Sequence, residues 1–217
     1  MDRRIFDLED ESCTNFVFQF RNKRTFLKEF KGSFDYIRAY HATKLNSSEL
    51  EMIRRTGLVQ TTPELLKKKA LARFIRPSDP VEFRMNVATE IEIHFNSRSL
   101  WIENRVFLGL VKEEFESQSY QYLLFGPESL LGLATELRQK FGVNFRQRMV
   151  EFGDPYLVEV NVPVAKTRPN SILNIYEYLI NHHPECCIVY RHAIEAQLIT
   201  NISQERNPAD IQGFVYC

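Results

Sequence analysis

The sequence has little cysteine, little glycine and no long apolar run. It contains 217 residues, of which only four are cysteine and eight are glycine. The cysteines are unevenly spaced, and the adjacent Cys186 and Cys187 rarely bond to each other, so we expect no disulfide framework and a reducing compartment. The chain also lacks linker-like, repeated and low-complexity segments, which favours one domain or one domain with a small addition.

No membrane span or export signal is visible in the sequence. No apolar run approaches the roughly 20 residues that a helix needs to cross a bilayer. The first residues, MDRRIFDLEDE, are charged and lack the apolar centre of a signal peptide. We therefore expect a cytoplasmic protein without a membrane partner.

An excess of charge of one sign is missing as well. The chain carries 28 basic and 28 acidic side chains, which gives a formal net charge of zero. General binders of nucleic acid or of membrane surfaces usually carry a basic excess, so the composition argues against that class. A local basic patch is still compatible with this balance.

Periodicity and turn residues predict strands and helices at irregular spacing. Strands are predicted at 16–20, 34–41, 105–111, 156–162, 187–191 and 194–202, with a loop at 113–120. Helices are predicted at 22–30, 47–56, 62–74, 81–94 (turning strand-like near its end), 129–141 and 171–181. This mixture favours an α+β fold with a split, mostly antiparallel sheet and flanking helices. We expect residues 1–33 to pack as a small N-terminal element on a main domain, 34–217.

The stretch AYHATKLNSSELEMIRRTGL, residues 39–58, carries the strongest local signals. A predicted strand runs into a helix that Asn46 caps, and Glu49 stands at the third helical position, as a capping box needs. Gly57 can take the left-handed position that ends the helix. The segment therefore predicts a strand that ends near His41 and Thr43, followed at once by a well-formed helix.

This block resembles the first motif of the ADP-ribosyltransferase superfamily, in its poly(ADP-ribose)-polymerase-like and diphtheria-toxin-like branch. The likeness rests on a strand with Tyr-His-x-Thr, then a helix that ends in Gly57-Leu58. It implies that His41 and Thr43 bind NAD, with the histidine on a ribose and the threonine near the nicotinamide amide. Ala42 departs from the glycine usual there. The alternative is that both side chains only satisfy backbone groups at a turn.

A second block, SYQYLLFGPES at 119–129, continues the resemblance. In the family's His–Tyr–Glu order, Tyr120 or Tyr122 would stack on nicotinamide, and Glu128 would stabilise the ribosyl cation. The alternative for Glu128 is an ordinary acidic residue at a helix start. Glu159, in the predicted strand YLVEVNV, is the competing glutamate, and its own alternative is an outward-facing polar position.

The resemblance implies an NAD-dependent ADP-ribosyltransferase that breaks the nicotinamide–ribose bond and transfers ADP-ribose to a macromolecular acceptor, protein or nucleic acid. The likeness to bacterial members implies a bacterial toxin or defence protein. NAD would have to bind without a Rossmann fold, because the chain has no P-loop, GxGxxG or GxSxG motif. Two alternatives stay open: a non-catalytic relative that binds a nucleotide or protein, and an unrelated interaction or immunity protein.

Two further clusters in the sequence contain metal-ligand or basic residue types. The segment HHPECC, residues 182–187, contains metal-ligand residue types, but it lacks a partner cluster on a second segment, so we predict no metal site. Lys67-Lys68-Lys69, with Arg73 and Arg76, forms a basic helix face. A solvated surface is the ordinary interpretation of such a face, and a patch that contacts phosphate or nucleic acid is the alternative.

Overall fold

A computed structural model of the chain describes residues 4–98, 104–117, 119–184 and 186–206. Within these residues the chain forms a six-stranded sheet in the order β5-β3-β2-β4-β6, and β1 pairs in parallel with the start of β2. All other pairs are antiparallel. The strands are β1 (Ile5–Phe6), β2 (Tyr36–Leu45), β3 (Val106–Gly109), β4 (Asp154–Pro163), β5 (Cys187–Tyr190) and β6 (Ile199–Gln204). The α+β, mostly antiparallel prediction is confirmed.

Strand β2 organises the sheet. It pairs with β4 along its whole length, from Tyr36 opposite Pro163 to Leu45 opposite Asp154. Its other neighbour, β3, meets it at a single pair, Tyr40 opposite Gly109. Beyond that pair the two strands do not continue as a ladder, so among the described residues the second half of β2 pairs with a strand on one side only.

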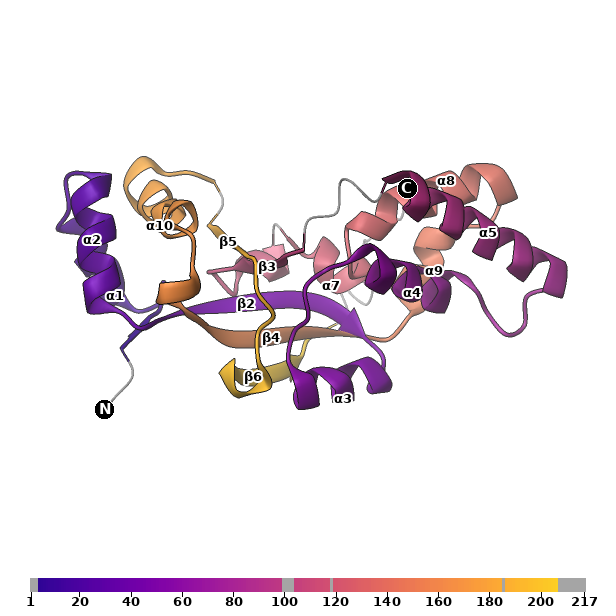
Figure 1. Ribbon diagram of the computed structural model, residues 1–217, viewed down its shortest axis with the longest axis horizontal. Helices are drawn as coiled ribbons and strands as arrows, with labels where there is room; N and C mark the ends of the chain where they lie inside the picture. The colour runs from indigo at the N-terminus through magenta and orange to yellow at the C-terminus, as the bar shows by residue number, and fades with distance from the viewer. Residues whose placement is uncertain (1–3, 99–103, 118, 185, 207–217) are drawn as a thin grey trace.

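Two groups of helices lie at the two ends of the sheet (Figure 1). One end holds α1 (Glu11–Phe18), α2 (Lys23–Ser33) and α10 (Pro169–Asn181). The other end holds α4 (Pro63–Phe74), α5 (Val81–Arg98), α8 (Ser129–Phe141) and α9 (Phe145–Glu151). Between them lie α3 (Ser47–Thr56) and the short helices α6 (Glu114–Ser117) and α7 (Gln121–Phe125). Single 3₁₀ turns occupy Val164–Lys166 and Ala196–Leu198.

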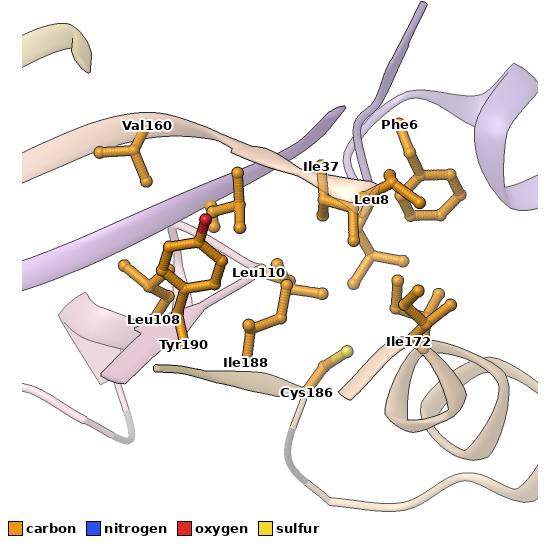
Figure 2. Packing of buried hydrophobic residues seen from close by; sticks show 14 of the residues in the cluster. Phe6, Leu8, Ile37, Leu108, Leu110, Val160, Ile172, Cys186, Ile188 and Tyr190 are labelled. Carbon is orange, nitrogen blue, oxygen red and sulfur yellow. The ribbon is translucent and has the colours of Figure 1, made fainter. Parts of the chain in front are cut away.

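Buried apolar side chains fall into three groups. The sheet cluster joins β1 to β5 with α1, α2 and α10, and Figure 2 shows part of it, including Ile37, Leu108, Val160, Ile172 and Ile188. The helical cluster joins α4, α5, α8 and α9. A small tyrosine cluster consists of Tyr40, Ala42, Phe115, Leu123 and Leu157, with Tyr122 packed against it. The predicted N-terminal element contributes α1 and α2 to the sheet cluster, and its boundary at residue 33 stays a prediction.

Several predicted helices are confirmed. The sequence signals that predicted them act within a few residues of the helix ends. The capping box of α3 forms as expected: Asn46 Oδ1 accepts from the Glu49 backbone N–H at 2.8 Å, and Glu49 Oε2 accepts from the Asn46 N–H at 3.1 Å. Gly57 ends this helix with φ +88°. The helices predicted at 62–74 and 129–141 form as α4 and α8, which begin at Pro63 and Ser129.

Other predictions were wrong. Residues 16–20 are not a strand, because Asp10 Oδ1 accepts from the Ser12 N–H at 2.7 Å and caps α1, which runs to Phe18. The strand-like end predicted near Phe95 is helical in α5, and the predicted loop at 113–120 contains α6. The last predicted strand is reduced to β6, because a 3₁₀ turn precedes Ile199.

The strand that carries His41 and Thr43 does not end at them. It continues to Leu45, because β4 pairs with it as far as Asp154. The motif residues therefore lie inside a paired strand instead of in a turn. The alternative interpretation is therefore wrong about a turn, but His41 does satisfy a backbone group, because its Nδ1 lies 2.9 Å from the Phe107 carbonyl oxygen.

Candidate functional site

The alternation of side chains along β2 separates the predicted site residues. Ile37 and Ala39 point into the sheet cluster, whereas Tyr40 and Ala42 belong to the tyrosine cluster. Successive side chains of a strand point to opposite faces, so His41 shares its face with Ala39, and the opposite face carries Tyr40. We call these the His41 face and the Tyr40 face of β2.

Tyr122 and Glu128 come together on the Tyr40 side. Helix α7 places the half-buried Tyr122 against the tyrosine cluster, 6.5 Å from the Phe115 ring. Gly126 ends α7 with φ +78°, and the chain then turns into α8, with Glu128 just before it. The Tyr122 hydroxyl donates to Glu128 Oε2 at 3.0 Å, and the glutamate is exposed. Two of the residues predicted from sequence therefore form a direct pair.

Tyr120 lies immediately before α7 and makes no side-chain capping bond to that helix. It is half-buried, as Tyr122 is. Only Tyr122 has a hydrogen bond to Glu128 among the described contacts of the two tyrosines. The geometry therefore favours Tyr122 as the tyrosine of the site.

His41 is half-buried at the point where β3 leaves β2. Its Nδ1 lies 2.9 Å from the Phe107 carbonyl oxygen. Burial lowers the pKa of His41 to about 4, the bond to Phe107 opposes that change, and the nearby Lys69 adds to it. The ring is therefore neutral at pH 7. Because a carbonyl only accepts, Nδ1 carries the proton and Nε2 is left as an acceptor.

Thr43, the other motif residue on the His41 face, is 3% exposed. A ligand could contact its side chain only if the covering residues moved aside. The structure thus does not bring His41 and Thr43 together with Tyr122 and Glu128: the two pairs lie on opposite faces of β2.

The competing Glu159 is held in an ionic cluster on the Tyr40 face. Its Oε1 lies 3.2 Å from Arg38 Nε and accepts from Thr200 Oγ1 at 2.8 Å. Arg38 also binds Asp7, with 2.9 Å between Nη1 and Oδ2. A carboxylate with these partners ties β2, β4, β6 and the N-terminal segment together, which is a structural role.

A basic group lies beside the second half of β2. Arg73 of α4 is 2% exposed, and its guanidinium donates to the Lys44 carbonyl at 3.0 Å and pairs with Glu49 at 3.3 Å. Lys44 is fully buried, and its ammonium donates to the Val150 carbonyl. Sequence analysis predicted Glu49 only as a capping residue. Its pairing with Arg73, 24 positions later, has no local signal in the sequence.

Metal binding finds no support in the residues that the structure describes, where no three His, Cys, Asp or Glu side chains gather as a metal site. In the segment 182–187, His182 caps α10 with a left-handed backbone and Cys186 is buried in the sheet cluster. Burial raises the pKa of the Cys186 thiol, which disfavours the thiolate that metals bind. Likewise, no helix in the described parts of the chain has the length and apolar character to cross a membrane.

Comparisons with known proteins do not assign a family. No protein-family model, no curated protein and no solved structure matches the chain. The resemblance to ADP-ribosyltransferases therefore rests on the two short blocks of sequence. The function has to be argued from the geometry of the residues in those blocks.

Proposed function

We propose that the protein is an ADP-ribosyltransferase-like enzyme that cleaves the nicotinamide–ribose bond of NAD and transfers ADP-ribose to a macromolecular acceptor. The observation that supports this proposal is the hydrogen bond from Tyr122 to the exposed Glu128. It joins two residues that the sequence motifs single out independently of the fold. It also presents a carboxylate to solvent with one oxygen fixed by a hydroxyl.

The proposed chemistry needs a group that stabilises positive charge. When nicotinamide leaves with the bonding electron pair, the ribose carbon that it leaves becomes cationic in character. The Glu128 carboxylate would stabilise that charge through a ribose hydroxyl, and the acceptor would then attack the same carbon and lose its proton. The Tyr122 hydroxyl would hold the carboxylate in position, and the ring beside it offers a platform for nicotinamide.

One observation favours a second candidate, a non-catalytic module that binds a nucleotide. His41 lies on the opposite face of β2 from Tyr122, so a single NAD molecule would have to pass around the edge of β2 beyond its pair with β3 to meet both. If it cannot, His41 binds a nucleotide that never meets Glu128. This candidate predicts binding of NAD without release of nicotinamide.

The experiment measures free nicotinamide after incubation of the purified protein with NAD, and NAD affinity by calorimetry. We expect Glu128→Gln to lower release by roughly 10²- to 10³-fold, the usual effect of removing one electrostatic group at a transition state. Tyr122→Phe should lower it by about tenfold or less, because only one neutral donor is lost. Glu64→Gln, the same change at the exposed start of α4, is the matched control.

The outcomes separate the candidates. Release that Glu128→Gln abolishes and Glu64→Gln preserves supports the enzyme. Release that persists in Glu128→Gln rejects Glu128 as the catalytic residue. Binding without release supports the non-catalytic module, and absence of both binding and release moves the assignment to an unrelated interaction or immunity protein.

A further inference from the structure

Lys69 differs from the other cations beside β2. The buried Arg73 and Lys44 each donate to protein acceptors, as described above. Lys69 is half-buried, and its ammonium makes no hydrogen bond and no ion pair to any residue that the structure describes, although its backbone carbonyl accepts from Arg73 Nη1 at 3.4 Å. It lies one helical turn before Arg73 on α4, so both side chains project from the same side of that helix. Its ammonium is therefore buried enough to lose hydration without gaining a protein partner.

The local charge balance leaves room for an anion. Lys69 and Arg73 are two cations one helical turn apart, and Glu49, which pairs with Arg73, is the carboxylate that the structure places beside them. Burial lowers the pKa of Lys69 to about 8, Arg73 adds to the decrease, and Glu49 opposes it. A cation whose charge is disfavoured in the free protein is one whose charge a bound anion would stabilise.

The neighbouring lysines of the same helix behave differently. Lys67 forms an ion pair with Glu92 of α5, and Lys68 is exposed. The basic run predicted from sequence is thus a solvated face only in part. Lys69 is half-buried, and its charge helps to lower the pKa of His41.

His41 narrows the chemistry of the ligand. Its neutral ring leaves Nε2 as a hydrogen-bond acceptor, which can accept from a hydroxyl group. Because the ring is neutral, it does not repel the neighbouring Lys69 ammonium. A ligand that uses both residues needs a hydroxyl and an anionic group close together, and a phosphorylated ribose has both. A metal ion is excluded by the surrounding positive charge.

We propose that Lys69 binds a phosphate of a nucleotide whose ribose hydroxyl donates to Nε2 of His41. The inference rests on the proposed function for identifying that nucleotide as NAD, in which the phosphates are the central diphosphate. The phosphate contact itself is tested without turnover, by using ADP and inorganic pyrophosphate as probes.

The first measurement follows the titration of the Lys69 side chain by NMR with and without ADP. We expect saturating ADP to move the pKa of Lys69 up toward the ordinary lysine value, because the phosphate favours the charged form. The charged and titratable groups that the structure places near Lys69 are Arg73, Glu49 and His41. Since the free amine titrates near pH 8, ADP affinity should fall by up to about tenfold per pH unit above that value.

The second measurement compares affinities of variants by calorimetry. Lys69→Met should weaken ADP binding by about 10- to 100-fold, the effect of one charged hydrogen bond, and Lys69→Arg should restore part of it. Lys68→Met, one position away and exposed, is the matched control and should bind ADP as the wild type does. Urea unfolding of each variant shows that the fold is intact.

The results for the two proposals can be told apart. The inference is overturned if the wild type binds neither ADP nor pyrophosphate, or if Lys69→Met binds ADP with unchanged affinity. Nicotinamide release with normal ADP affinity in Lys69→Met would retain the enzyme and reject the phosphate contact. ADP binding that depends on Lys69, without nicotinamide release, would retain the phosphate contact and reject the enzyme.

Discussion

The two ends of the molecule both pack aromatic rings, but they differ in how deeply their ion pairs are buried. At the end with α1, α2 and α10, aromatic rings pack on one another, for example Phe6 on Phe30 at 4.9 Å between centroids and Phe16 on Phe34 at 5.1 Å. At the end with α4, α5, α8 and α9 (Figure 1), a buried ion pair, Arg148–Asp79, accompanies the apolar cluster. Arg148 binds both carboxylate oxygens of Asp79 there, at 2.6 and 2.9 Å, with both side chains about nine-tenths buried.

The difference between the two ends indicates where a ligand-binding site would lie. Apolar contacts are non-directional and tolerate the absence of any single partner group. A buried charge requires a partner at a defined place, and breaking such a pair is costly. At the helical end Arg148 and Arg73 have ionic partners, whereas the Lys69 ammonium has none among the residues that the structure describes, so the site that we propose lies where the ionic arrangement is incomplete.

Replacing a ring at the aromatic end should have the largest effect. Phe30 is fully buried in the sheet cluster, so Phe30→Ala should lower the free energy of unfolding by about 3–5 kcal/mol through lost burial and a residual cavity. Urea unfolding monitored by circular dichroism measures this loss. Phe18→Ala, at a ring that is 55% exposed, is the control and should change stability little. A loss below 1 kcal/mol for Phe30→Ala would contradict the role of the aromatic end.

Breaking an ion pair at the helical end should come next. Asp79→Asn leaves Arg148 without its charged partner, and we expect a loss of about 2–3 kcal/mol in the same unfolding assay. The matched control is Glu92→Gln, which removes the partner of Lys67 at an exposed position and should leave stability unchanged within error. Equal effects of the two changes would show that burial does not distinguish these pairs.

The junction between α3 and the sheet offers a smaller test. Gly57 has φ +88°, and a Cβ added there would lie 1.9 Å from the Ile194 carbonyl oxygen. Gly57→Ala should therefore cost about 2 kcal/mol. Gly132→Ala, inside α8 with open space around it, should stabilise the protein by about 0.5–1 kcal/mol. Thermal unfolding of both variants measures these changes. Effects of the same sign would contradict the account of Gly57.

Removing the unpartnered cation should have the smallest effect and the opposite sign. Lys69→Met should raise the free energy of unfolding at pH 7 by about 1 kcal/mol, allowing for partial exposure of the ammonium. The folded-state pKa near 8 lies below the unfolded value of 10.5, so the wild type gains stability as pH rises between these values. The advantage of the variant should accordingly shrink over that range. A constant difference from pH 7 to 10.5 would reject the assigned pKa.

The sequence predicts best where the signal is local. The capping box of α3, Pro63 at the start of α4 and Gly142 after α8 each act within a few residues of the feature that they specify. The aromatic run at 16–20 was mistaken for a strand because its rings suit either element. Only their packing on Phe30 and Phe34, together with the Asp10 cap, selects the helix.

The candidate site is less predictable from the sequence, because it depends on contacts between residues that lie far apart in the chain. The motifs predicted Glu128 and either Tyr120 or Tyr122, and the turn at Gly126 allows the side chains of Tyr122 and Glu128 to meet. The separation of His41 from that pair depends on the continuation of β2 to Leu45, which a partner strand far along the chain imposes. The role of Glu49 in binding Arg73 depends on the docking of α4 and has no signature in either segment.

The pairing of β2 with β4 has a consequence for how the chain acquires its structure. Leu45 meets Asp154 roughly 110 positions further along, and the segment between them supplies most of the helical cluster. The helices can contact one another before β4 is in place, whereas β2 cannot complete its ladder until then. We expect refolding in which α4, α5, α8 and α9 gain protection from hydrogen exchange before β2 does, and pulse-labelling would reveal the order. The histidine and tyrosine motifs would then be the last parts of the molecule to reach their working positions.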